Sequence, residues 1–429
     1  MNLIRSSLAC ALSLTLAATL SVSALSLAGS PARAGEPAIA LTRHAQAGML
    51  RAGETALAAL AEKSPADPEA RMALGFARFA RAVETLGQNF HRYGFDTPGN
   101  SMLPLMRLPV PVNDNPEAID YAKLRAVYVA LLADLALTER TLAGLPPGAF
   151  KLPLDLDAVK LNFIGGERGG ETLGLLFQQL TEPPMRARRR NPPAAVETLP
   201  AFNVAFDRAD ALWLRGYINL LSAALEFVLA HDWRESYEAA GQRFFKGART
   251  DARLADDTEA NALTGRDGGA IADFIAMAHL VRWPATEPER LKKAHAHLKS
   301  VISLSRLTWQ EILAETDDDR EWLPGPKQKN AAFGALEVTQ ERVDGWLAAL
   351  DTFEAALDGK KLIPHWRFKQ GIDLKAVFFE PRAFDLVLWV TGHAAMPYLK
   401  PGEVISQSDW AQWQRIFSGN FLAYAFWFN

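Results

Sequence analysis

Hydrophobic residues recur with the spacing of amphipathic helices along most of the chain. Residues 39–61 place Leu41, Leu50 and Leu57 among alanines and charged residues, and residues 67–90 repeat this arrangement. The same period continues over residues 116–143, 207–231, 269–281, 287–315, 329–357 and 408–428. We therefore predict a mainly α-helical fold.

The first two helical segments are separated by a short stretch that contains two prolines. A helix does not easily continue through Pro65, whereas Pro68 suits the first turn of a new helix. So short a connection predicts that the two helices pack side by side as a helical hairpin.

Around this turn the sequence resembles a tetratricopeptide-repeat seam, over about residues 59–75. The resemblance is carried by Pro65, Glu69, Ala70, Leu74 and Gly75, while Arg71 stands where that family has a large aromatic residue. No second copy follows at a 34-residue period, and no family is identified for the whole chain. The resemblance implies stacked helical hairpins and a role in binding proteins or peptides.

Short extended segments interrupt the helices. Residues 151–163 and 365–379 are expected to form one or two short β-hairpin-like elements, and residues 384–390 suit either a strand or a buried helix. The glycine-rich residues 165–170 favour a flexible connector over a phosphate-binding loop, because the P-loop and dinucleotide-binding spacings are absent. The predicted fold is mainly α, with stacked antiparallel helical hairpins that are either tetratricopeptide-like or a helical toroid.

The prolines at 183–184 and 192–193 bracket four arginines, so residues 183–200 are expected to be a linker or an exposed loop. The four arginines either bind an anionic lipid, glycan or protein surface, or serve only to keep a solvent-exposed linker soluble. This boundary divides the chain into an N-terminal helical region, residues 35–182, and a C-terminal tryptophan-rich helical region, residues 201–429.

The first 34 residues read as a signal peptide. Arg5 precedes a long apolar run, and Ala32 to Ala34 offer a small-x-small cleavage pattern, so we expect cleavage after Ala34 and a periplasmic or secreted protein. An uncleaved membrane anchor is the alternative. Cys10 is the only cysteine, so the mature chain would contain none, and disulfides and thiolate chemistry would be excluded.

The composition is that of an ordinary globular protein, with 49% hydrophobic and 22% charged residues and a net charge of −3. This charge gives no support to nucleic-acid binding. All 11 tryptophans lie from Trp213 onward, where they either fill helix seams or line a binding cleft.

The helix over residues 207–231 is apolar around most of its surface but carries a polar stripe. Arg208, Arg215, Asn219, Ser222 and Glu226 recur on it at intervals of seven, four, three and four residues. Such a stripe either lines a polar cavity for a charged ligand or is a narrow solvent face with ion pairs. The candidate ligand-binding residues are Arg208, Arg215, Asn219, Glu226, His231 and Trp233.

No metal or cofactor is assigned. His231 and Glu235 are one helical turn apart if the helix continues, but further ligands are not grouped near them. The acids at 317–319 lack the spacing of a calcium loop and are expected to lie in a loop.

Three classes of function fit the sequence, and whether the protein is an enzyme stays open. The leading class is an exported helical protein that binds a protein, peptide or envelope polymer, with membrane contact only through an uncleaved leader. The others are a polysaccharide hydrolase or lyase on a helical scaffold and a small-molecule binding protein.

Overall fold

The computed structural model describes residues 35–96, 108–166, 170–173, 203–249, 275–276, 278–329, 337–419 and 421–429. They belong to one compact unit, Ala32–Asn429. The predicted signal peptide, the predicted linker at 183–200 and most of the predicted helix at 269–281 lie outside these residues.

The mainly α-helical prediction is confirmed. The α-helices are α1 (Glu36–Gln46), α2 (Leu50–Lys63), α3 (Pro68–Arg92), α4 (Tyr121–Ala143), α7 (Arg208–Ala230), α8 (Arg234–Ala240), α10 (Glu289–Ala314), α11 (Gln340–Leu357), α12 (Leu374–Phe379), α13 (Leu386–Thr391), α14 (Gln407–Ile416) and α15 (Phe421–Phe428). Two short 3-10 helices, η2 (Gly241–Arg243) and η4 (His393–Tyr398), are the other helical elements of the described residues.

Local chemistry explains where several helices begin. Asp67 accepts hydrogen bonds from the backbone N–H groups of Glu69 and Ala70, so α3 begins at Pro68, as the proline pattern predicts. Asp207 and Asp210 form a capping box at the start of α7. Both starts agree with the sequence pattern to within a residue.

Other boundaries differ from the pattern. The helix predicted over residues 39–61 is divided into α1 and α2, because Gly48 adopts a left-handed φ of 67°. The segment 408–428 is divided likewise, with Ser418 and Gly419 at positive φ between α14 and α15. Helix α4 begins five residues later than predicted, since Glu117 and Ile119 donate their N–H groups to Arg92 and Gly247 instead.

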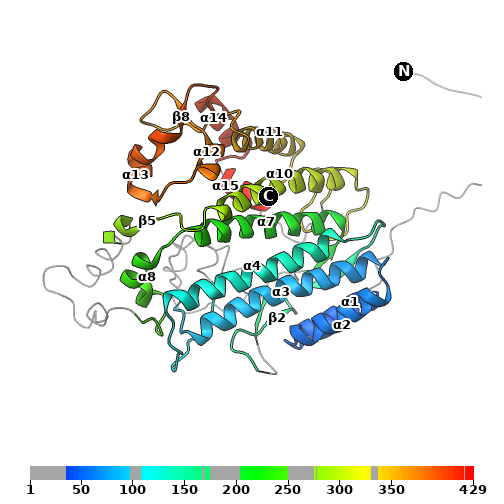
Figure 1. The fold of residues 1–429 in the computed structure, drawn as a ribbon. Helices are drawn as coiled ribbons and strands as arrows, with labels where there is room; N and C mark the ends of the chain where they lie inside the picture. Colours follow the sequence, from blue (N-terminus) through cyan, green and yellow to red (C-terminus); the bar gives the residue numbers. More distant parts are fainter. Residues whose placement is uncertain are drawn as a thin grey trace, which may run out of the picture. The chain divides into compact units, whose positions relative to one another are not determined.

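The long helices pack around α7. Figure 1 shows α3, α4, α7 and α10 side by side, with α1 and α2 against α3, and the helix contacts agree. By length and composition α7 is the one described helix that is apolar enough to cross a membrane. Its residues Leu214, Ile218 and Leu225 are buried in the core.

Aromatic clusters fill much of the C-terminal half. Trp309 is fully buried, and the rings of Trp213, Trp322 and Trp427 lie 5.1–6.5 Å apart between centroids. Trp366 and Trp410, at 75% and 45% exposure, are the exceptions. Core packing therefore accounts for most of the described tryptophans.

In the part of the chain that the structure describes, the strands form four two-stranded antiparallel sheets: β1 (Leu152–Asp155) with β4 (Asn203–Phe206), β2 (Lys160–Leu161) with β3 (Glu171–Thr172), β5 (Arg282–Trp283) with β7 (Phe384–Asp385), and β6 (Gly371–Ile372) with β8 (Leu399–Lys400). In the longest sheet Leu152 pairs with Phe206. This sheet joins segments from the two sides of residues 183–200.

The close approach of α3 to Phe163 gives a test of the packing. A Cβ atom at Gly87 would collide with the ring of Phe163, which is 2% exposed. Gly87→Ala should therefore lower the free energy of unfolding by about 1–3 kcal/mol, measured by urea denaturation. Adding Phe163→Leu should recover part of the loss, whereas two independent, additive losses would contradict this packing.

Candidate functional site

The two arginines at the start of the predicted polar stripe face the region of α4. Arg208 donates from Nη2 to the carbonyl oxygen of Gly148 at 3.2 Å. Arg215 donates from Nε and Nη2 to the carboxylate of Glu139 on α4, at 3.1 and 2.9 Å. Both guanidinium groups are therefore used in contacts within the fold.

Asn219 and Glu226 lie in the contact between α7 and α10. The Oδ1 atom of Asn219 is 2.7 Å from Nδ1 of His297, whose pKa is lowered by burial. Glu226 accepts a hydrogen bond from Nη1 of Arg290 at 2.8 Å, and its side chain is only 5% exposed. These polar side chains satisfy one another across the helix interface.

The last two predicted site residues lie at the end of α7. His231 is 2% exposed, its Nδ1 is 2.7 Å from the carbonyl oxygen of Phe227, and burial lowers its pKa. The ring of Trp233 packs edge-on against Tyr121 at 4.7 Å, and its buried indole N–H has no acceptor among the described residues.

The structure thus brings Asn219 close to Arg215 and His297 but does not gather the six predicted residues around one cavity. Two surface pockets, of about 290 and 670 Å³, have other linings. The smaller is lined by Gln88, His91, Arg92, Asn113, Asn115, Glu117, Ile164 and Gly165, and the larger by Arg51, Glu54, Thr55, Ala58, Ala59, Glu62 and Arg81. Ligand binding by the stripe stays a prediction.

The two ion pairs of α7 form a matched test of their structural role. Arg290 and Arg215 are similarly exposed, at 20% and 22%, but their partners Glu226 and Glu139 are 5% and 25% exposed. Arg290→Met should cost about 3 kcal/mol of unfolding free energy because it leaves a buried charge unpaired, and Arg215→Met about 1 kcal/mol or less. Chemical denaturation measures both.

The control is the double variant Arg290→Met with Glu226→Gln, which removes the unpaired charge and should recover part of the stability. Equal losses for the two arginine variants would show that the burial of Glu226 does not decide the effect.

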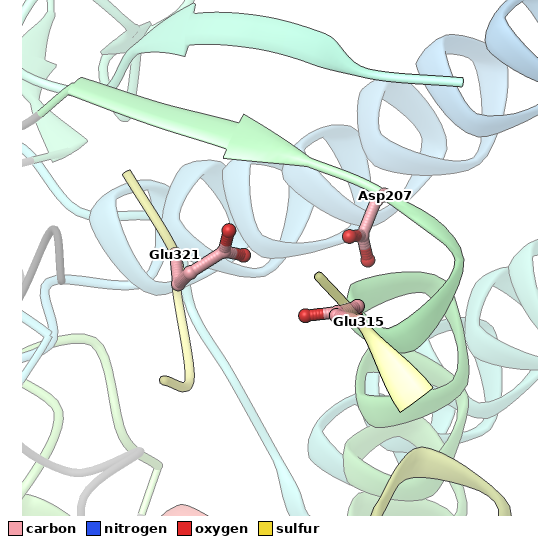
Figure 2. A group of neighbouring side chains, drawn as sticks. All are labelled: Asp207, Glu315 and Glu321. Carbon is pink, nitrogen blue, oxygen red and sulfur yellow. The ribbon is translucent and has the colours of Figure 1, made fainter. Parts of the chain in front are cut away.

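A second cluster of charged residues lies where α7 begins and α10 ends. Figure 2 shows the carboxylates of Asp207, Glu315 and Glu321 facing a common space, and ligand oxygens from the three lie within 4.8 Å of one another. Asp207 precedes α7, Glu315 follows α10, and Glu321 lies in the loop beyond it. We call these three residues, with Asp210 and Asp317, the carboxylate cluster.

Lys151 enters the carboxylate cluster from the residue before β1. Its Nζ lies 3.0 Å from Asp207, 2.8 Å from Asp317 and 3.5 Å from Glu321. Burial alone would lower the pKa of Lys151, but these negative charges outweigh it and raise the pKa. The ammonium group therefore stays charged at neutral pH and links three segments of the chain.

One lysine does not balance five carboxyl groups. Phe206 and Trp322, the chain neighbours of Asp207 and Glu321, are buried with ring centroids 6.2 Å apart, so the cluster borders the apolar core. Burial and the charge of Asp207 raise the pKa of Asp210 well above its usual range, and the same causes raise that of Glu315 to about 8.

The oxygen donors of Asp207, Glu315 and Glu321 are those that hard cations prefer, so these residues could hold a metal. A cation would have to compete with the ammonium of Lys151 and with protons. The oxygens are also closer than the roughly 5–10 Å spacing of glycosidase carboxylates, and neither pocket reaches them. A structural role explains the cluster best.

Sequence reasoning missed this cluster because its members come from distant parts of the chain. The sequence offers only two signals for the cluster: Asp207 directly before a helix and the acids at 317–319. We expect these acids to lie in a loop, and the structure places them in one. The long-range pairing of β1 with β4 brings Lys151 close to Asp207.

The raised pKa of Glu315 predicts a pH dependence. A carboxyl group with a pKa near 4.5 when unfolded and about 8 when folded binds its proton more tightly in the folded state. It therefore stabilises the fold at low pH, and this stabilisation is lost as the pH rises towards 8. Glu315→Gln should stay stable over this range and melt at a higher temperature than the wild type at pH 8.

Thermal melts between pH 5 and pH 8.5 measure the difference. Glutamine still accepts a hydrogen bond from Gln328, which donates to Glu315 at 3.0 Å. Glu238→Gln, on the exposed side of α8, is the matched control and should follow the wild-type curve. Parallel curves for Glu315→Gln and the wild type would refute the assignment.

A third feature is an exposed apolar surface on the segment 360–400, which we call the C-terminal lobe. Six of the sixteen exposed large hydrophobic side chains among the described residues lie in it: Trp366, Phe379, Leu386, Leu388, Val390 and Met396. None of the residues of α13 is buried, although five of its six are apolar. The segment 384–390, expected to be a strand or a buried helix, forms β7 and this exposed helix.

We compared the chain with known proteins and found no relative. No known protein family, curated protein or solved structure matches this chain. The class of protein is therefore inferred from its own fold and surfaces.

Proposed function

We propose that this chain is an exported helical protein that binds another component of the cell envelope through the apolar surface of its C-terminal lobe. Helix α13 carries the proposal, since it is an ordered apolar helix without a buried residue. Concentrated exposed apolar side chains mark interaction sites in soluble proteins. The signal-peptide pattern of the first 34 residues supports an address outside the cytoplasm.

The helices supply a rigid support in this proposal, stacked as hairpins in the manner of tetratricopeptide repeats. Gly75, one of the residues that carry the resemblance, supports this stacking: a Cβ atom there would collide with Leu142 of α4. A small residue at this position lets α3 and α4 approach closely, which is how helical hairpins pack.

The lobe is held in place by contacts that leave its apolar surface free. Asp385 accepts a hydrogen bond from the N–H of Leu388 at 2.8 Å and so caps α13, while β7 pairs with β5. Phe384 packs against Phe227 of α7 at 5.3 Å. The exposed side chains are therefore presented from a fixed backbone.

The test is retention of the protein in the envelope fraction of an expressing bacterium. The wild-type chain should stay with the washed envelope, and Leu388→Ser with Val390→Ser should release it to the soluble fraction, because two exposed apolar anchors are lost. Immunoblotting quantifies both fractions, and mass spectrometry shows whether the mature chain begins at Gly35.

The matched control is Leu307→Ser with Leu313→Ser on α10, which removes two leucines that are 45% and 44% exposed elsewhere. It should be retained like the wild type. Equal retention of all three proteins would contradict a role of the C-terminal lobe.

A further inference from the structure

The C-terminal lobe is basic within an acidic protein. Residues 360–400 contain seven Lys and Arg against three Asp and Glu, a net charge of +4, whereas the whole chain has −3. Lys360, Lys361 and Lys400 are paired with acids. The exposed Arg367, Lys369, Lys375 and Arg382 make no ion pair with any carboxylate in the described part of the chain.

Two of these four cations lie beside exposed aromatic rings. The guanidinium of Arg367 lies 5.0 Å from the ring centroid of Trp366, and the ammonium of Lys375 lies 5.9 Å from that of Phe379. The indole N–H of Trp366 donates to the carbonyl oxygen of Val390 at 3.0 Å, so Trp366 lies beside α13. Arg367 is thus presented together with Trp366 and α13, and Lys375 together with Phe379.

The shape of the surface favours a fluid partner over a protein. Leu386, Leu388 and Val390 are all exposed, yet positions two apart point to different sides of a helix. Exposed apolar side chains therefore lie on more than one side of α13, and a folded partner would need a groove that covers these sides. A bilayer accepts such an element without a matching groove, and tryptophan with Lys and Arg is typical of side chains at the lipid interface.

We infer that the C-terminal lobe docks on an anionic lipid bilayer, with α13 and Trp366 entering the interface and Arg367, Lys369, Lys375 and Arg382 contacting the headgroups. This inference rests on the proposed function and names its partner. It departs from the expectation that only an uncleaved leader contacts a membrane.

A small core of its own keeps the lobe rigid enough for this role. Ile372, Ala395 and Tyr398 are buried together, and Trp389 of α13 stacks on Tyr398 with ring centroids 5.8 Å apart. This core holds one side of α13, and Leu386, Leu388 and Val390 of the helix are exposed to solvent. Docking would need no unfolding of the lobe.

The experiment is co-sedimentation of residues 35–429 with vesicles of phosphatidylcholine, alone or mixed with phosphatidylglycerol. The described residues all lie in this range and belong to one compact unit. The protein should bind the anionic vesicles about tenfold more tightly than the neutral ones, and binding should weaken from about 0.05 to 0.5 M NaCl because salt screens the attraction.

Two variants separate the apolar and the cationic contributions. Leu388→Ser with Val390→Ser should weaken binding to anionic vesicles at least about tenfold. Glutamine at Arg367, Lys369, Lys375 and Arg382 should abolish the preference for anionic lipid. The charge-matched control places glutamine at the exposed Lys63, Lys246, Lys293 and Lys327 and should bind like the wild type.

Circular dichroism and thermal melts check that each variant is folded. Brominated lipids should quench the tryptophan fluorescence of the wild type more than that of Trp366→Phe. Absence of vesicle binding, or equal binding by the two charge variants, would overturn the inference. If envelope retention still depended on Leu388 and Val390, the proposed function would stand with a protein or polymer partner. Loss of a dimer in the Leu388 and Val390 variant by light scattering would assign the surface to a second copy and overturn it as well.

Discussion

The structure depends on one constraint, which is that the charged and amide side chains of α7 that lie against α4 and α10 must find partners on those helices. Arg215 binds Glu139 of α4, while Glu226 binds Arg290 and Asn219 meets His297, both on α10. An unpaired charge at the position of Glu226 would be costly in so apolar a setting. These pairs therefore specify which faces of α4 and α10 pack on α7, and the apolar residues around them fill the remaining space.

The same rule distinguishes the two concentrations of charge outside α7. In the carboxylate cluster Lys151 pairs with three of the acids, and Asp207 and Asp210 cap α7. Burial raises the pKa of Asp210 and Glu315, so the charge of the cluster is reduced and balanced within the fold. In the C-terminal lobe four cations have no acidic partner among the described residues, and two of them, Arg367 and Lys375, lie beside the exposed rings of Trp366 and Phe379. Charge that the fold neutralises is structural, and charge that it leaves free is available to a partner.

Local signals in the sequence were sufficient for the helical class and for the starts of α3 and α7, where proline and aspartate act through their own backbone neighbours. They did not predict the break at Gly48, because glycine also occurs within helices. The polar stripe was found from its spacing, but its partners on α4 and α10 were not, since they follow from packing. The carboxylate cluster and the exposure of α13 likewise depend on segments that only the tertiary structure brings together.

The rings of Trp213, Trp322 and Trp427 come from three distant segments and meet within 5.1–6.5 Å. Indoles at such separations couple electronically, so they form a natural chromophore that exists only while the start of α7, the loop after α10 and α15 are in contact. The near-ultraviolet circular dichroism of this protein should therefore report that convergence directly. A state that keeps its helices but loosens this junction would lose the signal while its far-ultraviolet spectrum remained.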